Sequence, residues 1–368
     1  MDKLSPVWRR IQPGFQFFLK VRMPGLDLKP AAGAEMMDAL LVSEPALSLE
    51  DIRRPIEAEL EAFRRYYREA MRSPVALLDK VVQYMLRRKG KRIRPLLVLL
   101  SAKLCGGITE TSYRGAALVE LLHTATLVHD DVVDDAERRR GVFSINALWR
   151  NKIAVLFGDF LLSRGLLLAL EHGDYDLLHT LSDAVRRMSE GELLQIEKAR
   201  HLDIDERTYF RIISDKTASL ISACTSAGAI SATSDLDSIG RMKAFGENLG
   251  LSFQIRDDLF DFGVADVGKP LGIDIKEKKM TLPLIAALRN AETGERRRIL
   301  AIIRKRHQSR DDLRHVSRFV EEKGGIAYAR KLMHHHAATA QAEVAHFPPC
   351  DARDSLLALV DYTVNRKN

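Results

Sequence analysis

The sequence predicts an all-α fold, a single large helical bundle around a deep central cavity. Apolar residues recur at helical spacing along almost the whole of the 368-residue chain from Ser48 onward. Alternating β-branched residues, the pattern of half-buried strands, are nearly absent, and no internal repeat period is found. The first 46 residues differ in composition, so we expect an N-terminal extension over residues 1–46 and an all-helical domain over residues 47–368.

The extension contains five prolines among scattered basic and aromatic residues, and we expect it to be poorly ordered. Residues 7–22 are basic and partly amphipathic, which leaves a targeting or membrane-touching role open. We prefer two simpler explanations, a plain disordered tail or a true start at Met36 or Met37. The sequence alone does not decide the role of this segment.

The helical domain begins at a capping-box-like pattern, in which Ser48 is followed three residues later by Asp51. A second helix opens at Ser73-Pro74, because proline is favoured in the first turn of a helix. The same apolar periodicity predicts helices over 95–105, 112–134, 152–171, 176–199, 207–230, 236–262, 282–290, 310–322 and 325–345.

Composition limits the class of protein. Hydrophobic residues make up 46% and charged residues 29% of the chain, which is typical of a soluble globular protein, and we expect no transmembrane segment. The net charge of +7 suits anionic partners, but no basic stripe with interleaved aromatic residues indicates nucleic acid. The three cysteines lie far apart, which fits a reducing compartment and no zinc site. We therefore expect a cytoplasmic protein, with loose membrane association left open.

Two groups of aspartates lie on apolar, helix-patterned segments. The first aspartate cluster is Asp130, Asp131 and Asp134, and the second aspartate cluster is Asp257, Asp258 and Asp261. The first and last aspartates of each cluster are four residues apart and share one helix face, where like charges destabilise the helix. A compensating cation is therefore expected, and Mg²⁺ prefers a few carboxylates together with phosphate oxygens. The alternative, two solvated acidic helix ends, is disfavoured by the basic motifs.

Basic motifs accompany both clusters. The first motif contains Lys91 and Arg94, which follow Gly90 and precede Pro95. The second motif, directly after the first cluster, is Arg138, Arg139 and Arg140. Lysine offers a point charge and arginine a bidentate fork for phosphate. Further candidates are Lys216, Thr217 and Gln254, with Lys269 and Lys279 in a loop over residues 268–281. Taken singly, each motif is explained as well by a solvated turn or by charge balance as by phosphate binding.

Histidines are more ambiguous. His123 lies seven residues before Asp130, two helical turns away on nearly the same face, so a functional role and simple packing are equally good interpretations. The pair His129-Asp130 resembles a feature of metal phosphohydrolases, but no further histidine ligands follow at suitable spacing. We interpret residues 334–336, three consecutive histidines, as an exposed helical run.

Together these motifs resemble the trans-isoprenyl diphosphate synthases, the polyprenyl synthetase family, and in particular its long-chain, octaprenyl-type members. The matching strings, in family order between about residues 85 and 285, are GKRIRP, ELLHTATLVHDDVVDD, RRRG, GDFLLSR, SEGELLQ, DKTASL, FQIRDDLFDF and GIDIKEKKMTLPL. Two positions depart from the family pattern. Lys89 replaces the first glycine of Gly-Gly-Lys, and Lys278-Lys279 stands where Gly-Lys is common.

The resemblance implies a mechanism and assigns the residues to it. Asp130, Asp134, Asp257 and Asp261, helped by Asp131 and Asp258, would bind Mg²⁺ that bridges an allylic diphosphate. Arg139, Lys216, Thr217, Gln254, Lys269 and Lys279 would bind this diphosphate. Isopentenyl diphosphate, held by Lys91, Arg94, His123 and Arg140, would attack the allylic carbocation. The metals and cations stabilise the leaving diphosphate, and apolar helix faces keep water from the cation.

The resemblance also implies a long-chain product, because the family elongates its product along the helix of the first cluster. Ala125 and Thr126 lie five and four residues before Asp130, roughly 5 Å below the metals, where short-chain members carry bulky aromatics. Small residues there leave the shaft open, unless Ala125 is small for helix packing alone. Quinone side chains are the expected use. The exact product length, the preferred primer and the downstream pathway are not fixed by the sequence.

Two other functions are considered. A class I terpene synthase shares the first motif but pairs it with a second motif of Asn or Asp with Ser/Thr and Glu, whereas this chain has aspartates throughout. A non-catalytic prenyl synthase subunit typically loses aspartates, and this chain keeps all six. A homodimer is expected, since the family is usually dimeric.

Overall fold

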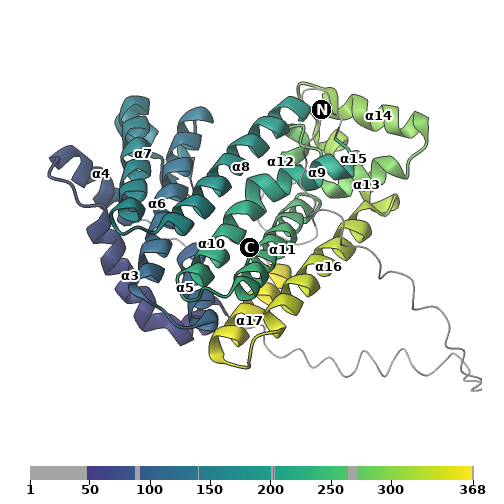
Figure 1. The fold of residues 1–368 in the computed structure, drawn as a ribbon. Coiled ribbons are helices and arrows are strands. Elements are labelled where there is room, and N and C mark those ends of the chain that lie inside the picture. Colours follow the sequence, from purple (N-terminus) through teal and green to yellow (C-terminus); the bar gives the residue numbers. More distant parts are fainter. Residues whose placement is uncertain are drawn as a thin grey trace, which may run out of the picture. The chain divides into compact units, whose positions relative to one another are not determined.

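The computed structural model describes residues 48–87, 92–139, 141–199, 202, 204–263 and 272–366. The expected extension over residues 1–46 lies outside these, and its boundary with the helical domain stays a prediction. In the described part, the predicted all-α fold is confirmed, because nearly all elements are helices (Figure 1).

The first half of the domain holds the helix of the first aspartate cluster. Its elements are α2 (Leu49–Arg53), the 3₁₀ turn η2 (Arg54–Ile56), α3 (Glu57–Ala70), α4 (Ala76–Leu86), α5 (Ile93–Cys105), α6 (Glu110–Val133), the strands β1 (Arg138–Arg139) and β2 (Val142–Phe143), α7 (Ile145–Glu171) and α8 (Tyr175–Ala199). β1 pairs antiparallel with β2 in a small hairpin directly after the cluster.

The second half holds the helix of the second cluster. Its elements are α9 (Glu206–Ile213), the π turn η3 (Ser214–Ala218), α10 (Ser219–Ile230), α11 (Leu236–Phe260), α12 (Ile273–Lys276), α13 (Leu282–Arg289), α14 (Thr293–Arg304), α15 (Arg310–Glu322), α16 (Gly325–Ala345) and α17 (Asp351–Asn365).

Local sequence signals explain several helix starts. The predicted capping box is confirmed: Ser48 Oγ accepts from the Asp51 N–H at 3.2 Å, and Asp51 Oδ2 accepts from the Ser48 N–H at 3.1 Å. Thr109 caps α6 in the same way, so that this helix begins at Glu110, two residues earlier than predicted. Ser144 caps α7, which begins well before residue 152.

The helix predicted over residues 207–230 is confirmed in extent, but the π turn inside it was not predicted. The chain there forms α9, the π turn η3 and α10 in succession, because the apolar periodicity is carried through the turn with one residue added. The hairpin β1–β2 and the helices α12, α14 and α17 also go beyond the sequence-based prediction. α12 has only four residues, and the first half of α14 is polar, so both carry too weak a periodicity to indicate them.

Helix α10 lies at the centre of the described domain, packed against α5, α8 and α11 (Figure 1). Nearly all its residues are buried, and most are Ala, Ser, Thr or Gly. A Cβ at Gly228 would lie 2.2 Å from the Val98 carbonyl oxygen of α5, so only glycine permits this approach. Small residues therefore bring the helix backbones close together around α10.

Among the described residues, one helix, α7, is long and apolar enough to cross a membrane, with about a third of its apolar stretch buried. Core helices of soluble proteins meet the same criterion of length and composition. The expectation that the chain has no transmembrane segment thus stays a prediction.

Candidate active site

A cavity of about 250 Å³ lies beside the second aspartate cluster, at the C-terminal end of α11. Apolar side chains of α9 form part of its wall. The predicted site residues that line it are Lys216, Thr217, Gln254, Asp257, Asp258, Asp261 and Lys279. The described structure therefore brings most of the predicted allylic-diphosphate group together, although its members are up to 63 positions apart in the sequence.

Asp258 is the buried member of the second cluster, with 5% of its surface exposed. The Tyr209 hydroxyl donates to its Oδ2 at 2.7 Å, and Gln254 Nε2 donates to its Oδ1 at 3.0 Å. Burial raises the pKa of Asp258 to about 7, despite these two hydrogen bonds. Both oxygens thus already have protein donors, and the carboxyl group is anchored in the wall of the cavity.

Asp261 is satisfied on one side only. Its Oδ1 accepts from the Ile273 N–H at 2.7 Å, whereas its buried Oδ2 has no hydrogen-bond partner in the described part of the chain. Burial, followed by the negative charge of Asp274, raises the pKa of Asp261 to about 6. A buried carboxylate oxygen without a donor is costly unless a cation binds it, so this position fits a divalent metal.

Asp257 faces a cation from the C-terminal end of the chain. The Arg366 guanidinium hydrogen-bonds Asp257 Oδ1 and lies over the ring of Phe253, 4.0 Å from its centroid. Arg256 donates to the Arg366 carbonyl oxygen at 3.0 Å, which holds the chain end against α11. Arg366 is not among the predicted site residues, because nothing in the sequence places a residue after α17 beside α11.

In the first cluster, as in the second, the middle aspartate is the buried one. Asp131 is 2% exposed and accepts from Arg139 Nε at 2.6 Å. The carboxylates of Asp130 and Asp134 make no hydrogen bond or ion pair within the described ranges. Asp130 is solvent-exposed, yet surrounding protein atoms remove part of its hydration and raise its pKa; Asp134 adds to this shift and Arg139 opposes it. The two outer aspartates are therefore available for a ligand.

Lys216 links the two clusters. It lines the cavity beside the second cluster, and its charge also acts to lower the pKa of Asp130 in the first. Its ammonium group pairs with Glu192 of α8 and donates to Gln195 Oε1 at 3.3 Å. Thr217, its neighbour on η3, donates to Gln254 Oε1 at 2.9 Å. Lys216 therefore lies beside the second cluster and within electrostatic reach of the first.

The described residues contain no preformed group of three or more His, Cys, Asp or Glu side chains arranged around one point. The two outer carboxylates of each cluster therefore offer oxygen ligands without a closed protein cage. Mg²⁺ sites commonly combine one or two carboxylates with water and phosphate oxygens.

The predicted isopentenyl diphosphate group is only partly described. Lys91 and Arg140, like Lys269 of the allylic group, lie outside the described residues. Arg94 and His123 are half-buried on α5 and α6, and neither lines the cavity. The charge of Arg94 acts on buried Cys224 of α10, so Arg94 lies near the central packing of α5 against α10.

The predicted chain-length residues also lie away from the cavity. Ala125 is 2% exposed, and Thr126 donates to the His123 carbonyl oxygen at 2.8 Å. Below them, α6 packs tightly on α7, since a Cβ at Gly165 would lie 3.0 Å from Leu118 Cδ1. Any shaft along α6 would thus be bounded by Leu118, Leu121 and Leu122.

Two further residues line or approach the site without a predicted role. Asp274 of α12 lines the cavity, 3.6 Å from Lys279 Nζ. Lys279 also pairs with Glu277 at 2.5 Å. The pKa of Lys279 is raised: burial alone would lower it, but the hydrogen bond to Glu277 and the charge of Asp274 outweigh burial. The three histidines at residues 334–336 take no part: the first two are exposed, and His336 bonds Asn248 Oδ1 at 2.9 Å.

Comparison with known proteins identifies relatives over most of the chain. The profile of the polyprenyl synthetase family matches residues 75–320. An all-trans-nonaprenyl-diphosphate synthase (geranyl-diphosphate specific) of Rhodobacter capsulatus is 35% identical over 86% of this chain and 98% of its own length. A short chain isoprenyl diphosphate synthase of Methanothermobacter thermautotrophicus is 34% identical over 80% of this chain and 92% of its own.

The fold agrees with these sequence matches. The crystal structure of a polyprenyl synthase from Caulobacter crescentus, complexed with calcium and isoprenyl diphosphate, superposes with a TM-score of 0.79 at 35% identity. The match covers 88% of this chain and all of that one.

The raised pKa values predict how stability depends on pH. Asp258 and Asp261 titrate near pH 7 and pH 6 in the folded protein, above their ordinary value of 3.8. Between about pH 4 and pH 7 these two carboxyl groups bind more protons in the folded protein than in the unfolded chain, so their contribution to the unfolding free energy falls as the pH rises. Asp258→Asn should flatten this fall in denaturant unfolding with EDTA. An equally steep fall in the variant would contradict the assignment.

Proposed function

Because the chain belongs to the polyprenyl synthetase family, we propose that this trans-polyprenyl diphosphate synthase uses Mg²⁺ to elongate an allylic diphosphate with isopentenyl diphosphate. The product is a long-chain, all-trans polyprenyl diphosphate. The observation that carries the proposal is the pair of aspartate clusters near Lys216, with Asp261 lining the cavity and its buried Oδ2 without a partner among the described residues.

The residues fit a divalent metal. Asp130 and Asp134 on one side, and Asp257 and Asp261 on the other, would hold Mg²⁺ ions. Bound Mg²⁺ would act as a Lewis acid on the diphosphate oxygens. Asp257 would exchange its contact with Arg366 for this role. Asp131 and Asp258 would remain in the wall, held by Arg139 and Tyr209.

The protein's own cations would complete the allylic site. Lys216, Arg139, Lys269 and Lys279 offset the charge that grows on the leaving diphosphate, with Thr217 and Gln254 as hydrogen-bonding groups. The carbon–oxygen bond breaks, and the double bond of isopentenyl diphosphate attacks the resulting allylic cation. This attack forms the new carbon–carbon bond and leaves a second carbocation, which loses a proton to the departing diphosphate to form the new double bond. Lys91, Arg94, His123 and Arg140 would hold isopentenyl diphosphate.

Two other functions have less support. A class I terpene synthase and a non-catalytic prenyl synthase subunit both leave unexplained why each cluster keeps three aspartates. The relatives compared above are named as diphosphate synthases, which favours chain elongation.

Activity should depend on Mg²⁺, and Asp130→Ala or Asp257→Ala should lower turnover by at least about a hundredfold, because each removes a metal ligand that acts in the transition state. The measurement is product formation from labelled isopentenyl diphosphate and farnesyl diphosphate. Near wild-type turnover of either variant at saturating Mg²⁺ would disprove the metal assignment. A cyclic hydrocarbon product would instead identify a terpene synthase, and no product would identify a non-catalytic subunit.

The product length rests on a separate observation, since both short-chain and long-chain synthases are among the relatives. Ala125 and Thr126 are small, and a growing chain that followed α6 away from Asp130 would meet no aromatic side chain at these positions. We therefore propose a long-chain product, for which quinone side chains are the expected use.

Ala125→Phe should shorten the product by several isoprene units while the first condensations continue, since an aromatic ring five residues before Asp130 would close the shaft. Chromatography of the products measures this directly. Thr217→Ser offers a control in the same site that leaves the shaft untouched. An unchanged product distribution from folded, active Ala125→Phe enzyme would refute this course of the shaft.

We also propose that the protein is a homodimer that pairs through α7. Four apolar side chains lie on one face of this helix beyond the kink at Arg150, and each is at least 40% exposed: Val155, Leu156, Leu167 and Leu170. An apolar face of this extent is typical of a protein–protein contact, and a second copy would cover it symmetrically. The same contact would explain the apolar character of α7 in a cytoplasmic protein. The three described cysteines are free, which agrees with a reducing compartment.

Leu156→Glu combined with Leu167→Glu should convert the dimer to a monomer at micromolar concentration, because two buried carboxylates would face their symmetry copies. Light scattering or sedimentation measures the mass. Leu236→Glu, at an 80% exposed leucine on α11, is the matched control and should remain dimeric. A wild-type monomer at this concentration would count against the proposal.

A further inference from the structure

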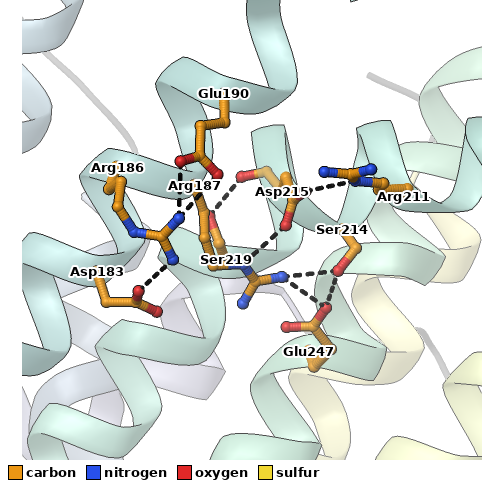
Figure 2. Close-up of polar contacts among 9 residues, drawn as sticks. All are labelled: Asp183, Arg186, Arg187, Glu190, Arg211, Ser214, Asp215, Ser219 and Glu247. Carbon is orange, nitrogen blue, oxygen red and sulfur yellow. Dashed lines mark hydrogen bonds and ion pairs between the residues drawn. The ribbon is translucent and has the colours of Figure 1, made fainter. Parts of the chain in front are cut away.

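The π turn η3 carries Lys216 and Thr217, two predicted phosphate-binding residues that line the cavity. A π turn fits one extra residue into a helix, and such turns are rare and frequent at functional sites. Because the turn is intrinsically less favourable than α-helix, other contacts must hold it in place. The structure shows these contacts on both sides of η3 (Figure 2).

Two glycines bring neighbouring helices directly onto the turn. A Cβ at Gly191 of α8 would lie 3.0 Å from the Lys216 backbone nitrogen, and a Cβ at Gly250 of α11 would lie 2.5 Å from Ala218 Cα. The turn is therefore packed between α8 and α11 with no side chain in between. This packing fixes its position but provides no directional contact that would fix its rotation.

Directional contacts come from Arg187 of α8. Its Nε donates to Asp215 Oδ1 at 2.8 Å, and one terminal nitrogen donates to Ser214 Oγ at 2.8 Å and lies 3.5 Å from Glu247 Oε1 (Figure 2). Ser214 in turn hydrogen-bonds Glu247 of α11. Arg187 is 23% exposed and Asp215 18%, so water weakens these contacts less than on an open surface.

Arg187 contacts the residues of η3 that do not line the cavity. None of Arg187, Ser214, Asp215 and Glu247 lines the cavity, whereas the next two residues of the turn, Lys216 and Thr217, do. Successive residues of a helical turn point in different directions. A contact that holds Asp215 against Arg187 therefore also sets the direction in which Lys216 and Thr217 point.

We propose that Arg187 is a positioning residue of the allylic site: its fork on Asp215 and Ser214 sets the orientation of η3 that presents Lys216 and Thr217 to the allylic diphosphate. The inference rests on the proposed function, because it takes the allylic diphosphate as the ligand of Lys216. Arg187 touches neither the cavity nor the substrate, and acts only through the turn.

The chain supplies a matched control in the neighbouring residue. Arg186 has the same side chain on the same helix but is 56% exposed, and it pairs with Asp183 at 2.6 Å and Glu190 at 2.8 Å (Figure 2). Neither partner belongs to η3. Loss of Arg186 removes a comparable charge without releasing the turn.

Arg187→Ala should raise the KM for farnesyl diphosphate by about tenfold or more, as expected when a binding group is misplaced, and leave the KM for isopentenyl diphosphate within about twofold. Arg187→Lys, which keeps the charge but loses the fork, should recover part of the loss. Arg186→Ala should match wild type. Equal increases in both KM values, or no increase in either, would overturn the inference. If Arg187→Ala does not fold, Asp215→Asn tests the same contact from the other side and should give the same pattern.

A double-variant comparison separates this inference from the function on which it rests. In the Lys216→Ala background, Arg187→Ala should raise the KM for farnesyl diphosphate by clearly less than it does in the wild-type background, since one of its two targets is already lost. Full additivity of the two effects would overturn the inference alone. A Lys216→Ala enzyme with wild-type allylic KM would overturn the assigned role of Lys216 and, with it, the inference.

Discussion

The concentration of negative charge at two helix C-termini is the constraint on which the rest of this structure depends. α6 and α11 each end in three aspartates, where the helix dipole already places partial negative charge. The protein offsets this charge unequally within each cluster. The middle aspartates, Asp131 and Asp258, are buried and hydrogen-bonded by Arg139 and by Tyr209 with Gln254. The outer aspartates of each cluster, Asp130 with Asp134 and Asp257 with Asp261, lie one helical turn apart. Protein donors thus fix each cluster through its middle residue, while the outer residues differ: Asp130 and Asp134 make no such contact in the described chain, whereas Asp257 meets Arg366 and Asp261 accepts from the Ile273 N–H.

The scaffold can hold these charges in place because its central helices approach one another closely. α10 is built almost wholly of small residues, and Gly228 and Gly246 bring it against α5 and α11. Gly191 and Gly250 do the same for the π turn η3 that precedes it. Close backbone packing leaves little freedom for the helix ends, so the charged groups mounted on them keep their relative positions. The polar contacts of Arg187 with Ser214 and Asp215 then add the direction that packing alone does not give.

Much of this could be predicted from the sequence, because the signals are local. Helical apolar periodicity, the Ser48 capping box and the two aspartate clusters each depend on residues within a few positions of one another. The clusters indicated a metal-bound diphosphate because like charges four residues apart on a helix face require a counter-ion. The family resemblance assigned Lys216, Thr217, Gln254 and Lys279 to one ligand, and the structure brings all four to the same cavity.

Only the tertiary structure decided which partners the charges meet. Arg366 reaches Asp257 from 109 positions away, Tyr209 reaches Asp258 from 49, and Arg187 reaches Asp215 from 28. None of these pairs has a sequence signature, since an arginine or tyrosine on an ordinary helix looks the same whether it meets water or a carboxylate. The π turn is equally invisible, because one added residue shifts the apolar periodicity too little to interrupt it. The sequence by itself determined the helical fold and the chemistry of the clusters, whereas long-range packing decided the orientation and neutralisation of each carboxylate.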